Sequence, residues 1–189
     1  MELDDTRTAI VFRPSIIAPN TKRLIQATEQ NHSLTDAERE HLTNKVTSWD
    51  IMNAERQLRT VTEILEDTAD EIGIYIEIVQ PQLTQKVDSY NIPVLDGEMQ
   101  SASVVAISDP SLRQVKKVRR LASDPSNCAG YIFLLSEQQR EADIMEDAGL
   151  VGATSSSKEY ANRARCIHIT HIEHHDHIRT AVAKCLQRL

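Results

Sequence analysis

Two short apolar runs constrain the fold of this chain more than any other feature. The runs cover residues 102–108 (ASVVAIS) and 131–135 (YIFLL), and both are rich in residues that favour strands. A strand that is apolar at nearly every position is typical of a parallel sheet, whose two faces are both covered by helices. Amphipathic helical patterns lie between the apolar runs, so we expect strands and helices to alternate along the chain.

The second half of the chain, residues 74–189, therefore predicts an α/β domain. Its expected sheet is open and mostly parallel, with helices on both faces. Glycine and proline residues between the periodic segments mark the turns. The sequence predicts strands at 74–79, 92–95, 102–108, 131–135 and 165–170, and helices at 81–90, 109–121, 136–148 and from about residue 171 to the C-terminus.

The first half, residues 1–73, predicts an acidic helical extension that precedes this domain. Its first 72 residues include 14 acidic and 8 basic side chains. Thr35 and Glu38 form a capping box that begins a helix, and Gly73 is typical of a helix end. Residues 48–53 interrupt the helical pattern between these two points. We expect a strand at 8–12 and helices at 20–30, 35–47 and 54–72.

Three segments of the second half carry a resemblance to a known signalling module. Val104–Asp109 is a buried strand with a terminal aspartate, and Tyr131–Ser136 is a buried strand with a terminal serine. Asp147–Ala153 is a connection of small residues before the last strand. From about residue 74 to residue 189, this order resembles a CheY-like receiver domain, the phosphoacceptor module of bacterial signalling. The resemblance implies a sheet of the flavodoxin-like or receiver-like kind.

The chain departs from the receiver pattern at the groups that would do chemistry. The resemblance implies an acidic pair after the first strand, which would hold Mg²⁺ beside the phosphoacceptor aspartate. The first strand of the segment ends instead in Val79-Gln80-Pro81, and no lysine follows the expected fifth strand. The segment therefore looks like a pseudo-receiver, which keeps the shape of the module without phosphorylation. Asp109 itself is expected to cap the helix that starts at Pro110.

Five of the seven histidines lie between Cys166 and His177, where a strand pattern changes to a helical one. Helical phasing places several of their imidazoles together on the apolar side of the last helix. Such a group could bind a divalent transition metal such as zinc, or form a pH-sensitive surface. The third alternative is a polar helix start with no metal. The candidate metal ligands are His168, His171, His174 and His175.

Composition narrows the range of functions. A net charge of −7 argues against nucleic acid or an anionic membrane as a partner. Three cysteines without a Cys-x-x-Cys pair fit a reducing compartment, and no apolar run reaches the length of a membrane span. The N-terminus lacks the apolar core of a secretory signal. We therefore expect a soluble protein of the cytoplasm. No cofactor is expected, because phosphate-binding glycine loops are absent from the sequence.

Two features suggest protein contacts. A basic face on the expected helix 109–121 could dock on acidic surface, either on the N-terminal helices of the same chain or on a second subunit. Trp49, in the interrupted segment, could anchor a partner or could belong to the core. The candidate interaction residues are Trp49, Arg113, Lys116, Lys117 and Arg120.

The sequence contains no complete catalytic constellation, which favours a non-enzymatic module that regulates or assembles through protein contacts, including self-association. A metal-dependent enzyme that uses the histidine cluster is one alternative. A second alternative is a role in phage or particle assembly. It rests on a similarity of Phe12-Arg-Pro14, Val46–Asp50 and Val61-Thr-Glu63 to patterns in phage tail-assembly chaperones.

Overall fold

The computed structural model describes residues 6–14, 17, 19–80, 96–136, 139–151 and 157–188. The predicted helix at 81–90 and strand at 92–95 lie outside these residues. The strands are β1 (Arg7–Phe12), β2 (Ile76–Val79), β3 (Val104–Ser108), β4 (Gly130–Leu135) and β5 (Ile167–His171). The helices are α1 (Pro19–Glu29), α2 (Asp36–Ile72), α3 (Asp96–Ser101), α4 (Leu112–Ala122), α5 (Glu141–Asp147), α6 (Lys158–Cys166) and α7 (His175–Leu186).

The five strands form one parallel sheet in the order β2-β1-β3-β4-β5, which confirms the predicted α/β class. This is the strand order of flavodoxin-like doubly wound sheets. The first strand of the chain, β1, lies inside the sheet, where Arg7 is opposite Ile76 of β2 and Ala9 is opposite Val104 of β3. The sheet therefore takes strands from both sides of residue 73, and a boundary there does not separate two structural units.

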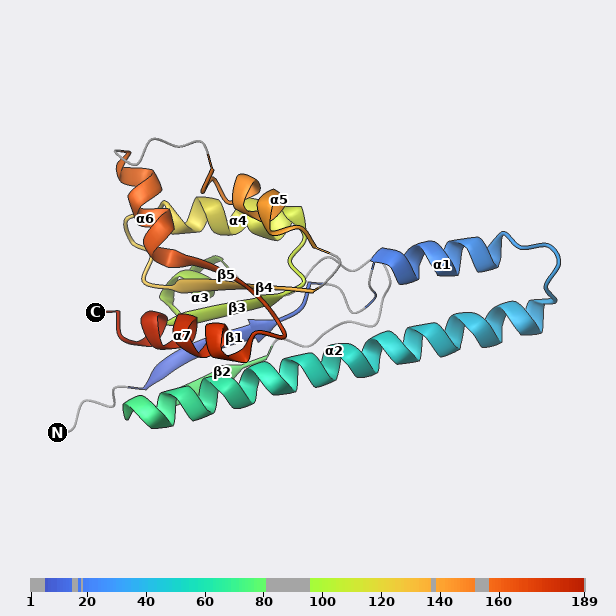
Figure 1. Ribbon diagram of the computed structural model, residues 1–189, viewed down its shortest axis with the longest axis horizontal. Helices are drawn as coiled ribbons and strands as arrows, with labels where there is room; N and C mark the ends of the chain where they lie inside the picture. The colour runs from blue at the N-terminus through green and yellow to red at the C-terminus, as the bar shows by residue number, and fades with distance from the viewer. Residues whose placement is uncertain are drawn as a thin grey trace.

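Helices cover both faces of the sheet (Figure 1). Helices α2 and α7 lie on one face, and α3, α4, α5 and α6 lie on the other. Side chains alternate along each strand between the two layers: Ala9 and Val11 of β1 pack toward α2 and α7, while Ile10 and Phe12 pack toward α4. All the residues of β3 and β4 are buried, as the continuous apolar runs predict.

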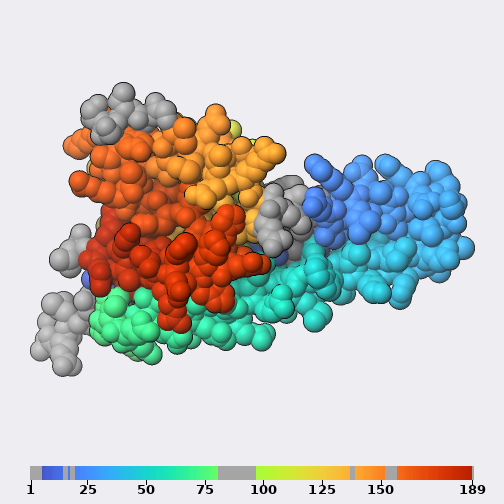
Figure 2. Space-filling model, viewed as in Figure 1, coloured from blue at the N-terminus to red at the C-terminus, as the bar shows by residue number. Residues whose placement is uncertain are grey.

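Helix α2 is continuous from Asp36 to Ile72, so the predicted interruption at 48–53 is wrong. At 1.5 Å per residue it is about 55 Å long. Only its C-terminal half, from Leu58 onward, packs on the sheet. Its N-terminal half leaves the sheet and pairs with α1 to form a projecting helical hairpin, here called the arm (residues 19–53; Figures 1 and 2).

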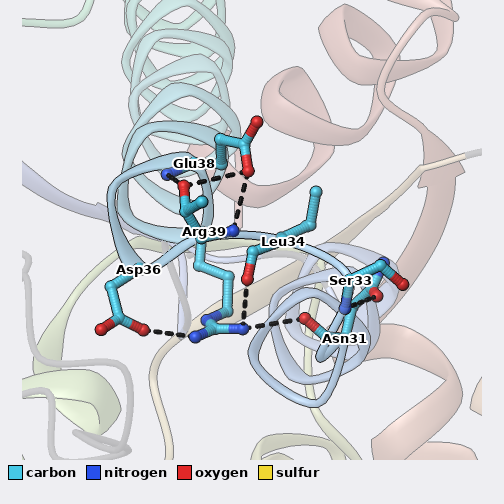
Figure 3. A network of polar contacts seen from close by, with 7 residues as sticks. Asn31, Ser33, Leu34, Asp36, Glu38 and Arg39 are labelled. Carbon is cyan, nitrogen blue, oxygen red and sulfur yellow. Dashed lines mark hydrogen bonds and ion pairs between the residues drawn. The ribbon is translucent and has the colours of Figure 1, made fainter.

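The ends of α2 are those that the sequence predicts. Oε2 of Glu38 accepts a hydrogen bond from the backbone N–H of Thr35 at 2.7 Å, and Oγ1 of Thr35 accepts one from the N–H of Glu38 at 3.2 Å. The capping box is thus confirmed, and Nη1 of Arg39 ties the same turn by donating to the carbonyls of Asn31 and Leu34, both at 2.8 Å (Figure 3). Gly73 ends the helix with φ of 72°, a left-handed conformation that glycine adopts at low cost.

The last helix, α7, approaches the sheet closely at Gly130, the first residue of β4. A Cβ atom added to Gly130 would lie 2.3 Å from Sγ of Cys185, so no larger residue fits there without displacement. Burial raises the pKa of the Cys185 thiol to about 12. Cys166 is also buried, whereas Cys128, in the loop before β4, is exposed.

Charged side chains interrupt the surface of every long helix. Helix α2 alone carries acidic or basic residues in most of its turns. None of the helices within the described residues combines the length and the apolarity that a bilayer crossing requires.

Substitutions at two leucines test whether the C-terminal half of α2 belongs to the core. Leu65 is fully buried against the sheet, whereas Leu24, on α1 of the arm, is about half exposed. We expect Leu65→Ala to lower the free energy of unfolding by roughly 2–5 kcal/mol, as large-to-small changes in cores do. Leu24→Ala is the matched control and should change it by less than about 0.5 kcal/mol. Equal losses in denaturant titrations would contradict this division of α2.

Candidate functional site

The candidate site lies where the strand order reverses, at the carboxyl ends of β1 and β3. Doubly wound sheets bind ligands at this edge, because the loops from β1 and β3 diverge there and leave a crevice. Arg13 directly follows β1 and Asp109 directly follows β3. Ser136 follows the neighbouring strand β4, and His171 ends β5.

Arg13 and Asp109 form an ion pair across this edge. Nη2 of Arg13 lies 2.8 Å from Oδ2 of Asp109, and the side chains are 6% and 17% exposed. The second carboxylate oxygen, Oδ1, accepts a hydrogen bond from the backbone N–H of Ser136 at 3.2 Å. The carboxylate of Asp109 therefore connects the ends of β1, β3 and β4. Charge-assisted hydrogen bonds of this kind are about twice as strong as neutral ones.

The backbone of Asp109 has a φ of 47°, the only left-handed value at a non-glycine residue among those described. Aspartate tolerates this region better than most residues, but at a cost. Hydrogen bonds hold the turn: the N–H of Asp109 donates to the carbonyl of Leu134 at 2.9 Å, and Nε2 of Gln139 donates to the carbonyl of Pro110 at 2.8 Å. The predicted capping role of Asp109 is wrong, because Ser111 is the N-cap of α4 and accepts from the N–H of Gln114.

Two buried donors at this edge, in addition to the acceptor Oε1 of Gln139, remain without a hydrogen-bond partner among the described residues. They are Nε of Arg13 and Oγ of Ser108, the last residue of β3. Both groups can donate a hydrogen bond. A water molecule or a small anion is the kind of species that such donors satisfy.

A divalent cation does not fit beside Asp109. The first strand of the sheet in chain order is β1, so the first strand expected at 74–79 is in fact the second, β2. Arg13 and Pro14 follow β1, and a fixed positive charge therefore stands where the receiver resemblance implies an acidic pair. The guanidinium already neutralises the carboxylate, and it would repel Mg²⁺ at short range. The residue that ends β5 is His171, which agrees with the predicted absence of a lysine there.

The histidine ring contacts join His171, His174 and His177 and do not include His168. Ile167 and Ile169 of β5 pack in the layer of α4 and α5. Because side chains alternate along a strand, His168 points to the opposite layer, toward α7. The charges that act on His168 agree with this placement, since they belong to Lys184 and Arg188 at the end of α7. Alternation along β5 therefore directs the side chains of His168 and His171 to opposite faces of the sheet.

The other candidate ligands lie at the start of α7. The helix begins at His175 with His174 as its N-cap, so the predicted helix start at about His171 is wrong. The ring centroids of His171 and His174 are 5.5 Å apart, and those of His174 and His177 are 5.1 Å apart. His174 and His175 are exposed rather than turned to the apolar side. Within the described residues, no three His, Cys, Asp or Glu side chains are arranged to hold a metal.

The candidate interaction residues lie at two separate places. Trp49 is 66% exposed on α2, so it does not belong to the core. The basic residues lie on α4, with Arg113, Lys116 and Arg120 exposed and Lys117 partly buried. Docking of this basic face on the acidic helices of the same chain is wrong, because α2 and α4 cover opposite faces of the sheet (Figure 1).

Comparison of this chain with protein-family models, with curated proteins and with solved structures finds no match. The resemblance to receiver domains therefore depends on the strand order and strand endings of this chain alone.

Sequence reasoning misses Arg13 as a site residue. The sequence predicts the strand at 8–12, but its helical surroundings place it in the N-terminal extension rather than in the sheet. Arg13 and Asp109 come together only because β1 and β3 are neighbours. The available signal is a charged residue directly after an apolar strand and before Pro14.

Removing the cation should show how strongly the ion pair holds the site. Arg13→Met keeps much of the side-chain volume but leaves the Asp109 carboxylate without its partner. We expect the free energy of unfolding to fall by roughly 3 kcal/mol. Asp109→Asn is compatible with the left-handed φ. In a double-mutant cycle by denaturant unfolding, the double variant should lose clearly less than the sum of the two single losses. An additive result would contradict the coupling.

The buried His168 predicts a dependence of stability on pH. Burial lowers its pKa, and the charges of Lys184 and Arg188 lower it further. The unfolded chain, with an ordinary histidine pKa of about 6.5, then takes up the proton first as the pH falls. The contribution of His168 is therefore complete above about pH 6.5 and is lost as the pH falls toward its lowered folded-state pKa.

Urea titrations between about pH 8 and 5 measure this effect. His168→Gln should make the free energy of unfolding fall less steeply with decreasing pH than in the wild type. His175→Gln, at an exposed position, is the matched control. If the free energy of unfolding of both variants fell with decreasing pH as steeply as that of the wild type, the assignment of the pH dependence to His168 would be wrong.

Proposed function

We propose that this chain is a non-enzymatic regulatory or assembly module that acts through protein–protein contacts and has the shape of a receiver domain without its phosphorylation. The observation that carries the proposal is the buried ion pair between Arg13 and Asp109. A phosphoacceptor carboxylate must be open to a phosphoryl donor and paired with a metal ion. Asp109 is instead closed by a guanidinium and by the N–H of Ser136.

The ion pair also has a structural role that supports this proposal. It joins the ends of three strands and satisfies the charge of a carboxylate that is mostly shielded from water. Ion pairs of this kind fix one arrangement of their surroundings. In a module that works by its shape, such a fixed strand edge would present the loops after β1 and β3 in one constant conformation.

The metal-dependent enzyme remains a separate hypothesis with its own test. The ring contacts among His171, His174 and His177 place three imidazoles in a row at the start of α7. Under our proposal, elemental analysis of untagged protein should find fewer than roughly 0.1 metal ions per chain. A structural metal site would instead hold close to one ion per chain. Near-stoichiometric metal that is lost in His171→Ala would favour the enzyme instead. The assembly role in phage or particles is one form of the protein-contact proposal.

The test of the proposed function is phosphorylation of Asp109. We expect incubation with a small acyl phosphate and Mg²⁺ to leave the intact mass of the chain unchanged, because Arg13 occupies the place of the metal. A receiver domain of proven activity, treated in parallel, is the positive control. An added phosphoryl group that disappears in Asp109→Asn would overturn the proposal.

A further inference from the structure

Helix α2 carries a row of exposed side chains along one side, most of them within the arm. The row, here called the stripe, begins with Glu38 near the tip and ends with Arg56 near the sheet. All its members are exposed, and its two largest apolar members, Trp49 and Met52, are 66% and 67% exposed. Large apolar side chains gathered on one surface mark a contact site. The stripe consists of Glu38, Leu42, Lys45, Trp49, Met52 and Arg56.

The stripe has the spacing of a coiled-coil seam. Its members follow one another at intervals of four, three, four, three and four residues. Alternation of these intervals keeps side chains in line along a helix, in the positions that meet a second helix. The series is the same when read in either direction. A stripe of this kind can therefore pair with an antiparallel copy of itself.

The described residues of the chain leave this side of α2 open. The residues that face the sheet, among them Leu58, Val61 and Leu65, lie about half a turn around the helix from the stripe. The contacts with α1 through Ile51 and Ala54 are also on the side away from it. A second helix could thus lie along the stripe, outside both α1 and the sheet (Figures 1 and 2).

We propose that the stripe binds the same stripe of a second copy, with the two α2 helices antiparallel. One register, with the twofold axis at the height of Thr47, brings three different complementary pairs together. Glu38 meets Arg56 of the second copy as an ion pair, and Leu42 meets Met52 as an apolar pair. Lys45 meets Trp49, whose indole face attracts a cation. By symmetry each pair occurs twice.

The complementarity selects a second copy over another partner. An unrelated partner would not require opposite charges at the two ends of the stripe, or a cation and an aromatic ring at equal distances from its centre. The arm also needs support, because none of its residues from 20 to 49 is buried. A helical hairpin without a buried apolar face is only marginally stable, and two paired hairpins would shield each other.

This inference deepens the proposed function by naming one partner, and its failure can be told apart from the failure of that function. Phosphorylation of Asp109 would overturn the pseudo-receiver role and leave the pairing of the arms unaffected. A monomer under all conditions would overturn the pairing and leave the ion pair of Arg13 and Asp109 unaffected.

The first experiment measures the molar mass in solution of the full chain together with its tryptophan fluorescence. Trp49 is the only tryptophan, so its emission reports on the stripe directly. We expect the mass to rise with concentration from 21.3 kDa toward twice that value, with a shift of the emission to shorter wavelength over the same range. A monomer at every concentration would overturn the proposal, and so would a dimer whose emission does not change.

The second experiment exchanges the two charges of the outer pair. Glu38→Arg and Arg56→Glu should each weaken the dimer, because each places like charges opposite one another. The double variant should restore it, since the antiparallel register then brings opposite charges together again with their positions exchanged. Glu38→Gln is the matched control, because glutamine can still close the capping box with Thr35. Lack of rescue in the double variant would overturn the antiparallel register.

Discussion

The need to bury both faces of a parallel sheet determines how every other element of this chain is placed. The residues of β3 and β4 leave no side chain in contact with water, so helices must cover them on two sides. Helix α2 provides apolar residues for this purpose only from Leu58 onward. Its first half has no sheet to cover and therefore extends beyond the body with α1. The apolar residues of α2 that cover the sheet are thus confined to its C-terminal half. This one pattern explains both why that half covers the sheet and why the other half forms the arm.

The same constraint explains the chemistry at the strand ends. A parallel sheet gathers the carboxyl ends of its strands at one edge, where polar groups from distant parts of the sequence come into contact. At this edge a mostly buried carboxylate requires compensation, and Arg13 provides it from the position directly after β1, 96 positions before Asp109 in the sequence. The left-handed backbone of Asp109 is held by hydrogen bonds to Leu134 and Ser136. Two polar contacts and one strained residue thus define the geometry of the site.

The sequence is sufficient to predict what depends on local patterns. The apolar runs indicate β3 and β4, Thr35 and Glu38 indicate the start of α2, and Gly73 indicates its end. It is not sufficient where a local pattern has two explanations. Residues 48–53 look like a break because Trp49 and Met52 depart from the apolar side of α2, whereas they belong to an exposed row on a continuous helix. The ion pair of Arg13 and Asp109 depends on which strands are neighbours in the sheet. The periodicity of apolar residues along the sequence does not indicate that order.

The one exposed cysteine, Cys128, and the single tryptophan, Trp49, give this protein two natural positions for optical probes. Cys166 and Cys185 are buried, and the raised pKa of Cys185 keeps it from forming the reactive thiolate at neutral pH. Cys128, on the loop before β4, is the exposed one of the three. It lies at the amino edge of the sheet, whereas the arm with the single tryptophan extends from the carboxyl edge. If an acceptor dye is attached to Cys128, energy transfer from Trp49 would therefore report the distance between the sheet and the arm. The chain would need no substitution for this measurement.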